Sequence, residues 1–285
     1  MFQAIEILGL RKKYKRFTLQ DVSFVLPAGH SMGLIGPNGA GKTTIIKLIM
    51  NLIRRDAGEI HIFGRDVIQD ELAVKRRIGF VYDVPPFFQD VKLRDIAKAM
   101  APFYPTWNQS IFESLMSEFE LPREKTVKKL SQGMQTKFAL LLALSHDADL
   151  ILMDEPTSGL DPVFRRDLMQ RLNGYLRDSS KAILYSTHIT TDLERSADYI
   201  TFLREGRLVF STTRDELLDS YAIVKGGHEL LKESYRPLFA GCHESSVGVT
   251  ALTADRKQAE RVLQDQAVVE RASLEDIMVF LNHGE

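Results

Sequence analysis

A chain of 285 residues with a formal net charge of -1 is long enough to bury one large core and one small one. The balance of 37 Lys and Arg against 38 Asp and Glu argues against a broad nucleic-acid-binding face, so no nucleic-acid partner is expected. The one cysteine, Cys242, excludes a disulfide framework and fits a reducing cytoplasm. Residues 1–10 carry Glu6 and no basic leader, so they predict a first strand rather than a signal peptide. No apolar run approaches the ~20 residues needed to span a bilayer, so any work at a membrane requires a partner.

The hydrophobic pattern predicts an α/β protein with a mainly parallel sheet. Two fully apolar segments, residues 149–153 and 181–187, are typical of strands in the middle of such a sheet. Residues 84–147 are dominated by helical patterns and predict an insertion, and residues 213–285 predict a small α+β appendage. The other expected elements are a hairpin over 4–27 with its turn near Lys15-Arg16, strand 31–36, helix 44–53, strands 59–63 and 77–82, helix 162–179, a hairpin over 199–211, strands near 222–225, 247–252 and 267–270, and helices 256–264 and 274–281.

Residues 36–44 fit the phosphate-binding pattern G-x-x-x-x-G-K-[ST] and lie between an apolar strand and an apolar helix. Backbone N–H groups of such a loop point inward, and the helix N-terminus adds partial positive charge. Lys42 is expected to reach the β- and γ-phosphates of a nucleotide, and the Thr43 hydroxyl to ligate Mg²⁺. The alternative is a glycine-rich turn that binds nothing. The expected nucleotide-binding residues here are Gly36, Pro37, Asn38, Gly39, Ala40, Gly41, Lys42, Thr43 and Thr44.

Two adjacent carboxylates, Asp154 and Glu155, follow the apolar strand 149–153. The carboxyl end of such a strand is the sheet edge where ligands bind, so Asp154 is expected to hold Mg²⁺, directly or through water. Glu155 is expected to orient or deprotonate the water that attacks the γ-phosphate. The alternative is that these side chains only cap a helix.

Four further segments resemble the ATP-binding cassette (ABC) ATPases, in the family's order. Leu130-Ser-Gln-Gly-Met134 resembles the family signature, and Ser158-Gly-Leu-Asp161 resembles the loop after the second carboxylate motif. His188 resembles the switch histidine, and Tyr14 resembles the aromatic residue that stacks on adenine. The resemblance covers about residues 4–212 and therefore predicts an ABC nucleotide-binding domain over 1–212, of the P-loop type with an antiparallel β subdomain, followed by the appendage 213–285.

The resemblance assigns roles that the residues alone leave open. Ser131 and Gly133 are expected at a helix N-terminus that faces the γ-phosphate held by a second subunit, although Ser131 alone reads as an ordinary N-cap. Asp161 lies in a loop that crosses the dimer interface in the family, or it only caps the helix after it. His188 is expected to hydrogen-bond the γ-phosphate, and otherwise is a strand-end histidine. Tyr14 offers a ring to adenine, or is an aromatic residue on a half-buried strand.

Two departures from the family pattern concern the signature and the segment after the strand 77–82. Gln132 replaces Gly and Met134 replaces Gln, and Met cannot donate or accept a strong hydrogen bond. Asp83 stands where the family usually has Gln, sometimes Glu, and its shorter charged side chain is expected to bind Mg²⁺ with less reach. The alternative for Asp83 is a turn residue before two prolines.

The resemblance implies an ATP-hydrolysing subunit of a bacterial ABC exporter, with ATP and Mg²⁺ as cofactors. Its expected partners are a second ABC subunit, identical or different, in a head-to-tail dimer, and separate integral membrane permease subunits. That implies a cytoplasmic chain, peripheral on the inner face of the cell membrane. Exporters of drugs, antimicrobial peptides or lipid-like compounds, including Ytr-type and phenol-soluble-modulin exporters, resemble it most. The alternative is a soluble ABC ATPase for nucleic-acid or protein remodelling.

The last expected helix carries an apolar stripe of Leu274, Ile277, Met278 and Leu281. The stripe packs either on its own chain or on the appendage of a second subunit. Because every matched nucleotide motif ends by His188, the appendage is expected to be dispensable for binding ATP.

Overall fold

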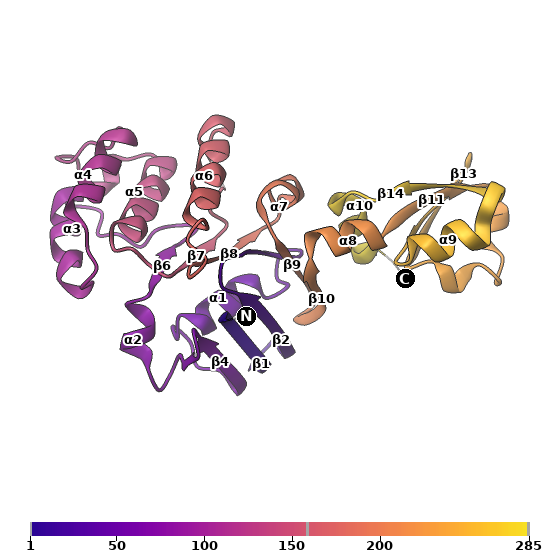
Figure 1. The fold of residues 1–285 in the computed structure, drawn as a ribbon, viewed down its shortest axis with the longest axis horizontal. Coiled ribbons are helices and arrows are strands. Elements are labelled where there is room, and N and C mark those ends of the chain that lie inside the picture. The colour runs from indigo at the N-terminus through magenta and orange to yellow at the C-terminus, as the bar shows by residue number, and fades with distance from the viewer. Residues whose placement is uncertain (1, 158–159, 284–285) are drawn as a thin grey trace. The chain divides into compact units, whose positions relative to one another are not determined.

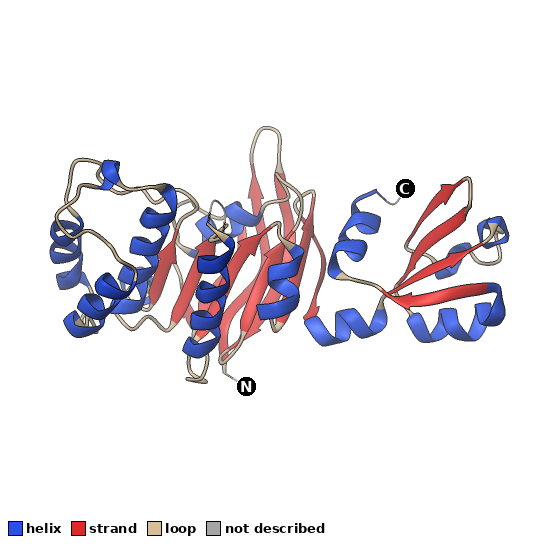
Figure 2. Cartoon of the chain, turned by 90° about the horizontal axis from the view of Figure 1, so that it is seen from above, coloured by secondary structure: helices blue, strands red, loops and turns tan. Residues whose placement is uncertain are grey.

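The computed structural model describes residues 2–157 and 160–283, which form two compact units. The first unit takes in residues 1–188 and 201–210, and the second takes in residues 189–200 and 211–285. The segment 189–200 therefore groups with the C-terminal part of the chain, whereas the sequence analysis placed it inside the first domain. Both units combine helices and strands (Figures 1 and 2).

The first unit is built on a six-stranded sheet with the strand order β10-β9-β3-β8-β7-β6. Strands β3, β8, β7 and β6 run parallel. Every residue of β3, β7 and β8 is buried, which explains why these strands are apolar on both faces. The strands are β3 (Ser31–Ile35), β6 (Ile78–Val81), β7 (Leu150–Asp154), β8 (Ala182–Thr187), β9 (Tyr199–Arg204) and β10 (Arg207–Thr213).

An antiparallel sheet and a set of helices complete the first unit. The antiparallel sheet has the order β2-β1-β4-β5, with β1 (Gln3–Lys13), β2 (Thr18–Pro27), β4 (Ala57–Ile62) and β5 (Arg65–Asp66). The insertion between β6 and β7 is helical, as its pattern predicted, and its helix α5 contacts β6. The helices are α1 (Lys42–Ile49), α2 (Glu71–Lys75), α3 (Leu93–Met100), α4 (Gln109–Glu118), α5 (Gln132–Ser145) and α6 (Pro162–Tyr175), with short 3₁₀ turns at Ala101–Phe103 and Val127–Lys129.

The second unit contains a four-stranded antiparallel sheet in the order β12-β13-β11-β14. Counted along the chain from β11, this is the order fourth-first-third-second of the split βαββαβ arrangement, with 3₁₀ turns in place of its first helix. The elements are α7 (Thr190–Ser196), α8 (Arg214–Ser220), β11 (Ala222–Gly226), 3₁₀ turns at His228–Leu231 and Arg236–Leu238, β12 (Gly241–Ser245), β13 (Gly248–Thr253), α9 (Arg256–Leu263), a 3₁₀ turn at Gln264–Gln266, β14 (Ala267–Arg271) and α10 (Leu274–His283).

The apolar stripe of the last helix finds its partners inside the second unit. Leu274 and Ile277 are fully buried, and α10 contacts α7, β12 and β13. Glu194 in α7 also accepts a hydrogen bond at 2.6 Å from the backbone N–H of Leu274, at the helix start. The stripe is thus covered by its own chain, which is the first of the two alternatives. Among the described residues, no helix is both long and apolar enough to cross a bilayer.

Candidate functional site

The phosphate-type loop lies at the carboxyl end of β3 and leads directly into α1, as its motif requires. Gly41 is the N-cap of α1 and has a φ of 111°, a left-handed conformation that favours glycine. A Cβ atom on Gly41 would lie 3.0 Å from the rings or methyls of both Phe17 and Leu19. Gly36 leaves room for the carbonyl oxygen of Leu203, with which a Cβ atom would collide. The loop can therefore follow this path only with glycine at these positions.

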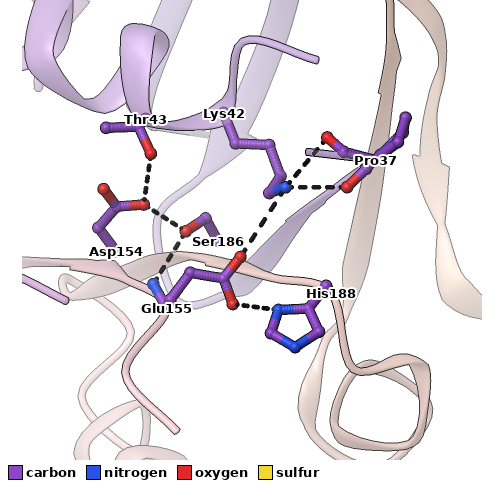
Figure 3. Close-up of polar contacts among 8 residues, drawn as sticks. Pro37, Lys42, Thr43, Asp154, Glu155, Ser186 and His188 are labelled. Atoms are coloured by element: carbon purple, nitrogen blue, oxygen red, sulfur yellow. Dashed lines mark hydrogen bonds and ion pairs between the residues drawn. The ribbon is translucent and has the colours of Figure 1, made fainter. Parts of the chain in front are cut away.

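Lys42 is the first residue of α1, and its ammonium group is folded back over the loop (Figure 3). Its Nζ donates to the carbonyl oxygens of Gly36 at 2.8 Å and of Pro37 at 3.4 Å. The same atom lies 3.8 Å from Glu155 Oε1. Burial lowers the pKa of Lys42, and the nearby carboxylates of Glu155 and Asp154 oppose that shift. The amine is thus a desolvated cation that is held beside the loop before any ligand arrives.

Asp154 ends β7 and is nearly buried, with 7 % of its surface exposed. Its Oδ1 accepts from the Ser186 hydroxyl at 2.6 Å and from the Thr43 hydroxyl at 3.2 Å (Figure 3). The register of the sheet explains the first contact, because Asp154 pairs with Ser186 across β7 and β8. Thr43 and Asp154, which the sequence analysis named as metal ligands, are therefore in direct contact.

Glu155 lies one residue beyond the strand in a left-handed conformation, with a φ of 48°. Its backbone N–H donates to Ser186 Oγ at 3.0 Å, and its Oε2 lies 2.8 Å from His188 Nδ1. His188 follows β8, and 58 % of its side chain is exposed. One hydroxyl, that of Ser186, therefore contacts both Asp154 and Glu155. Neither carboxylate caps a helix, since α6 begins only at Pro162.

A cavity of about 610 Å³ opens above the loop. It reaches from the phosphate-type loop to the aromatic rings of Tyr14 and Phe17, whose centroids are 6.4 Å apart. Tyr14 is 41 % exposed, so its ring is accessible. The lining residues are Tyr14, Arg16, Phe17, Asn38, Gly39, Ala40, Gly41, Lys42, Thr43, Thr44, Asp83 and Glu155.

Asp83 follows β6 and lines the same cavity. Partial burial and the neighbouring Asp154 raise its pKa, and His188 acts in the opposite sense. Within residues 2–157 and 160–283, no three His, Cys, Asp or Glu side chains form a metal-binding cluster. Thr43 and Asp154 are in contact at the loop, and Asp83 and Glu155 line the cavity.

The remaining expected site residues lie away from this cavity in the single chain. Ser131 is the N-cap of α5, where its Oγ accepts from the backbone of Met134 at 3.3 Å, and Gly133 lies in the first turn. Asp161 is the N-cap of α6 and accepts from the backbones of Val163 and Phe164. None of these three residues lines the cavity. The expected loop residues Ser158 and Gly159 lie outside the described residues.

Comparison with known proteins gives the family. A family model described as "ABC transporter" matches residues 19–158. The "ABC transporter ATP-binding protein YtrB" of Bacillus subtilis (strain 168) is 32% identical over 203 residues, which cover 71% of this chain and 69% of that protein. This chain belongs to the ABC transporter family. It is an ATP-binding subunit of such a transporter and an ATPase, which confirms the expectation drawn from the motifs.

One further comparison covers nearly the whole length of this ABC protein, and another compares its fold with a solved structure. The "Nod factor export ATP-binding protein I" of Rhizobium sp. (strain N33) is 30% identical over 298 residues, covering 99% of this chain and 98% of that protein. A solved "Structure of ATP binding subunit of ABC transporter" matches with a TM-score of 0.70 and 29% identity, covering 75% of this chain and 91% of that one. The predicted ABC-type P-loop fold is thereby confirmed.

The sequence analysis missed three residues at this site of the ABC protein. Ser186 lies in an apolar strand, and only the pairing of β7 with β8 reveals that it contacts the carboxylate pair. Arg16 and Phe17 are cavity-lining neighbours of Tyr14. The expected hairpin turn near Lys15-Arg16 was the available signal, because that turn adjoins Tyr14, the residue expected to stack on adenine.

Proposed function

We propose that this chain powers an ABC exporter by hydrolysing ATP in the cavity above the Gly36–Thr44 loop. The observation that carries the proposal is the position of Lys42, whose amine lies between the loop carbonyls and Glu155. A triphosphate seated on the loop would take over this cation, as in other phosphate loops. Tyr14, which lines the same cavity, offers an accessible ring to adenine.

The hydrolytic step rests on Glu155 and His188. Glu155 is 2.8 Å from His188 Nδ1, so the two side chains restrain each other at the end of the sheet where the γ-phosphate would lie. The Glu155 carboxylate orients the attacking water and accepts its proton, and His188 donates a hydrogen bond to the γ-phosphate. The Ser186 hydroxyl contacts both the Asp154 carboxylate and the Glu155 backbone, which holds the two residues in place.

The oxygen ligands for Mg²⁺ fit that ion. Magnesium in nucleotide sites is bound by one or two protein oxygens together with substrate phosphates, which agrees with a contacting Thr43–Asp154 pair and no larger carboxylate cluster among the described residues. Thr43 and Asp154 would hold the ion, and Asp83 is a further ligand candidate. When bound, Mg²⁺ neutralises charge that develops on the phosphates.

Ser131 and Gly133 act in trans under this proposal. Both lie at the start of α5, where backbone N–H groups are free to bind an anion, and both lie outside the cavity of their own chain. A second ABC subunit, identical or different, would bring this helix end to the γ-phosphate in a head-to-tail dimer, with the loop of Asp161 at the interface. Separate membrane permease subunits would hold the dimer at the inner face of the cell membrane. The name of one relative, "Nod factor export ATP-binding protein I", includes export, which supports outward transport of a drug, peptide or lipid-like cargo.

Two substitutions test the site. Lys42→Ala should abolish most ATP binding, because the loop loses the cation beside the triphosphate. Glu155→Gln should keep ATP binding and slow hydrolysis severely, and it should accumulate an ATP-bound dimer in gel filtration. Unchanged ATP affinity of Lys42→Ala in calorimetry would remove the proposed binding site. Near-normal turnover of Glu155→Gln would move the catalytic role to another residue.

Mixing two inactive variants tests the dimer. Lys42→Ala and Ser131→Arg each inactivate both sites of their own homodimer, but a mixed dimer rebuilds one site from an intact loop and an intact α5 start. Activity that reappears on mixing supports the trans arrangement. Complete inactivity of the mixture argues against a homodimeric site, or for strict coupling of both sites. Co-purification of the chain with a multi-span membrane protein tests the transporter assignment.

A further inference from the structure

The tip of the β1–β2 hairpin places one arginine in the cavity. The backbone N–H of Tyr14 donates to the carbonyl of Phe17 at 2.7 Å, so Lys15 and Arg16 are the two residues of the turn. Both side chains are exposed, but only Arg16 lines the cavity above the phosphate loop. The two neighbours thus have the same charge and exposure and differ in the direction of their side chains.

Three contacts fix this turn relative to the loop. The Phe17 ring packs against Gly41, where a Cβ atom would lie 3.0 Å from the ring edge. Gly206, in the turn between β9 and β10, donates its backbone N–H to Ala40 in the loop at 3.1 Å. The carbonyl of Gly206 accepts from the backbone of Gln20 in β2 at 2.7 Å. Because Gly206 bonds to both segments, the backbone of the turn that carries Arg16 is fixed relative to the loop.

The balance of charged residues that line the cavity indicates a function for Arg16. Its charged lining residues are Arg16 and Lys42 against Asp83 and Glu155, so the lining is balanced before a nucleotide binds. Lys42 is already occupied by Gly36, Pro37 and Glu155. The side chain of Arg16 makes no hydrogen bond or ion pair with any residue that the structure describes. A nucleoside diphosphate or triphosphate brings several negative charges, and Arg16 is the cation that is free to meet them.

We propose that Arg16 is a second phosphate-binding cation of the nucleotide site, supplied by the β1–β2 hairpin in addition to Lys42. The inference rests on the proposed function, because it takes the cavity as the nucleotide site. A guanidinium group presents a planar fork of donors that matches phosphate oxygens, and its charge is permanent. Lys15, one residue earlier and outside the cavity, should have no such role.

Calorimetric titration of the full chain with ADP tests this, at about 50 mM and about 300 mM salt, since screening separates a charge contact from stacking. Arg16→Ala should weaken ADP binding roughly fivefold at the lower salt concentration, and the loss should shrink at the higher one. Arg16→Lys should retain most of the affinity because it keeps the charge. Lys15→Ala is the matched control and should bind ADP like the unmodified chain. The Arg16 side chain makes no hydrogen bond or ion pair with the described residues, so these variants should fold normally.

The possible outcomes distinguish a failure of the Arg16 proposal from a failure of the proposed nucleotide site. Equal affinities of Arg16→Ala and Lys15→Ala, with Lys42→Ala impaired, would overturn the role of Arg16 and leave the nucleotide site in place. A loss in Arg16→Ala that is independent of salt and not restored by Arg16→Lys would also overturn it, because it indicates a contact with the base. If Lys42→Ala binds ADP normally, the proposed nucleotide site itself is refuted.

Discussion

Replacing Ser186 by alanine removes the one hydroxyl that joins the two carboxylate residues of the site. Ser186 is fully buried, donates to Asp154 Oδ1 at 2.6 Å and accepts from the backbone N–H of Glu155 at 3.0 Å. After the substitution, Asp154 retains the contact with the Thr43 hydroxyl at 3.2 Å. The N–H of Glu155, in a partly buried setting, loses its hydrogen-bond partner.

The size of the effect follows from these two hydrogen bonds. Removing the partner of a partly buried donor and a hydrogen bond to a buried carboxylate together cost about 2 kcal/mol in the free energy of unfolding. For a unit of about 200 residues, that corresponds to a melting temperature lower by about 4–8 °C. Turnover of ATP should fall as well, because the Asp154 side chain and the Glu155 backbone lose their shared anchor.

Thermal unfolding followed by circular dichroism measures this effect, with Ser145→Ala as the matched control. Ser145 is also fully buried, but its hydroxyl donates to the carbonyl of Leu141 one turn earlier in α5, a carbonyl that the helix already satisfies. Ser145→Ala should therefore change stability by less than about 0.5 kcal/mol. Equal melting temperatures for the two variants would refute the anchoring role of Ser186.

Three other perturbations have expected outcomes. Burial lowers the pKa of His146 from 6.5 to about 4, so the unfolded chain binds more protons between those pH values and stability falls as pH drops through that window. His146→Phe should remove that loss, up to about 3 kcal/mol, and parallel pH–stability curves for the two proteins would contradict it. Gly206→Ala should destabilise the fold and weaken ADP binding, because a Cβ atom there collides with the Thr18 carbonyl at a φ of 76°; calorimetry and melting check both effects. Glu194→Gln should lower stability by about 0.5–1 kcal/mol in denaturant titration, since a carboxylate at the start of α10 becomes neutral, and an unchanged midpoint would show that this cap is unimportant.

The parts of the site that the sequence predicted are those set by local constraints. The phosphate loop is recognisable because its glycines, Lys42 and Thr43 are adjacent in the chain and each has a separate physical reason. Asp154 is recognisable because it directly follows an apolar strand. Ser186 is different, since its role depends on which residue of β7 it faces, and that register is not written in either strand alone. The same holds for Arg16, whose access to the cavity depends on how the hairpin packs on the loop.

The fold shows the same division between local and long-range information. The strands with strong apolar patterns were predicted within a few residues, whereas β12 was missed because four of its five residues are exposed and Gly241–Ser245 has no alternating pattern. Helix α8 was missed too, although Thr213 and Glu216 form a capping box at its start. The grouping of 189–200 with the C-terminal unit is a tertiary effect, which local pattern cannot show.

The left-handed backbone of Glu155 sets stability against activity at that position. A non-glycine residue at a φ of 48° carries a conformational cost, which glycine avoids and asparagine reduces. A laboratory selection that rewards heat resistance alone would gain about 1 kcal/mol by installing glycine at position 155. Under our proposal, the same change deletes the carboxylate that orients water. Libraries that are screened for thermostable variants of this chain should therefore keep Glu155 fixed, because a gain in stability at that position would come with the loss of ATPase activity.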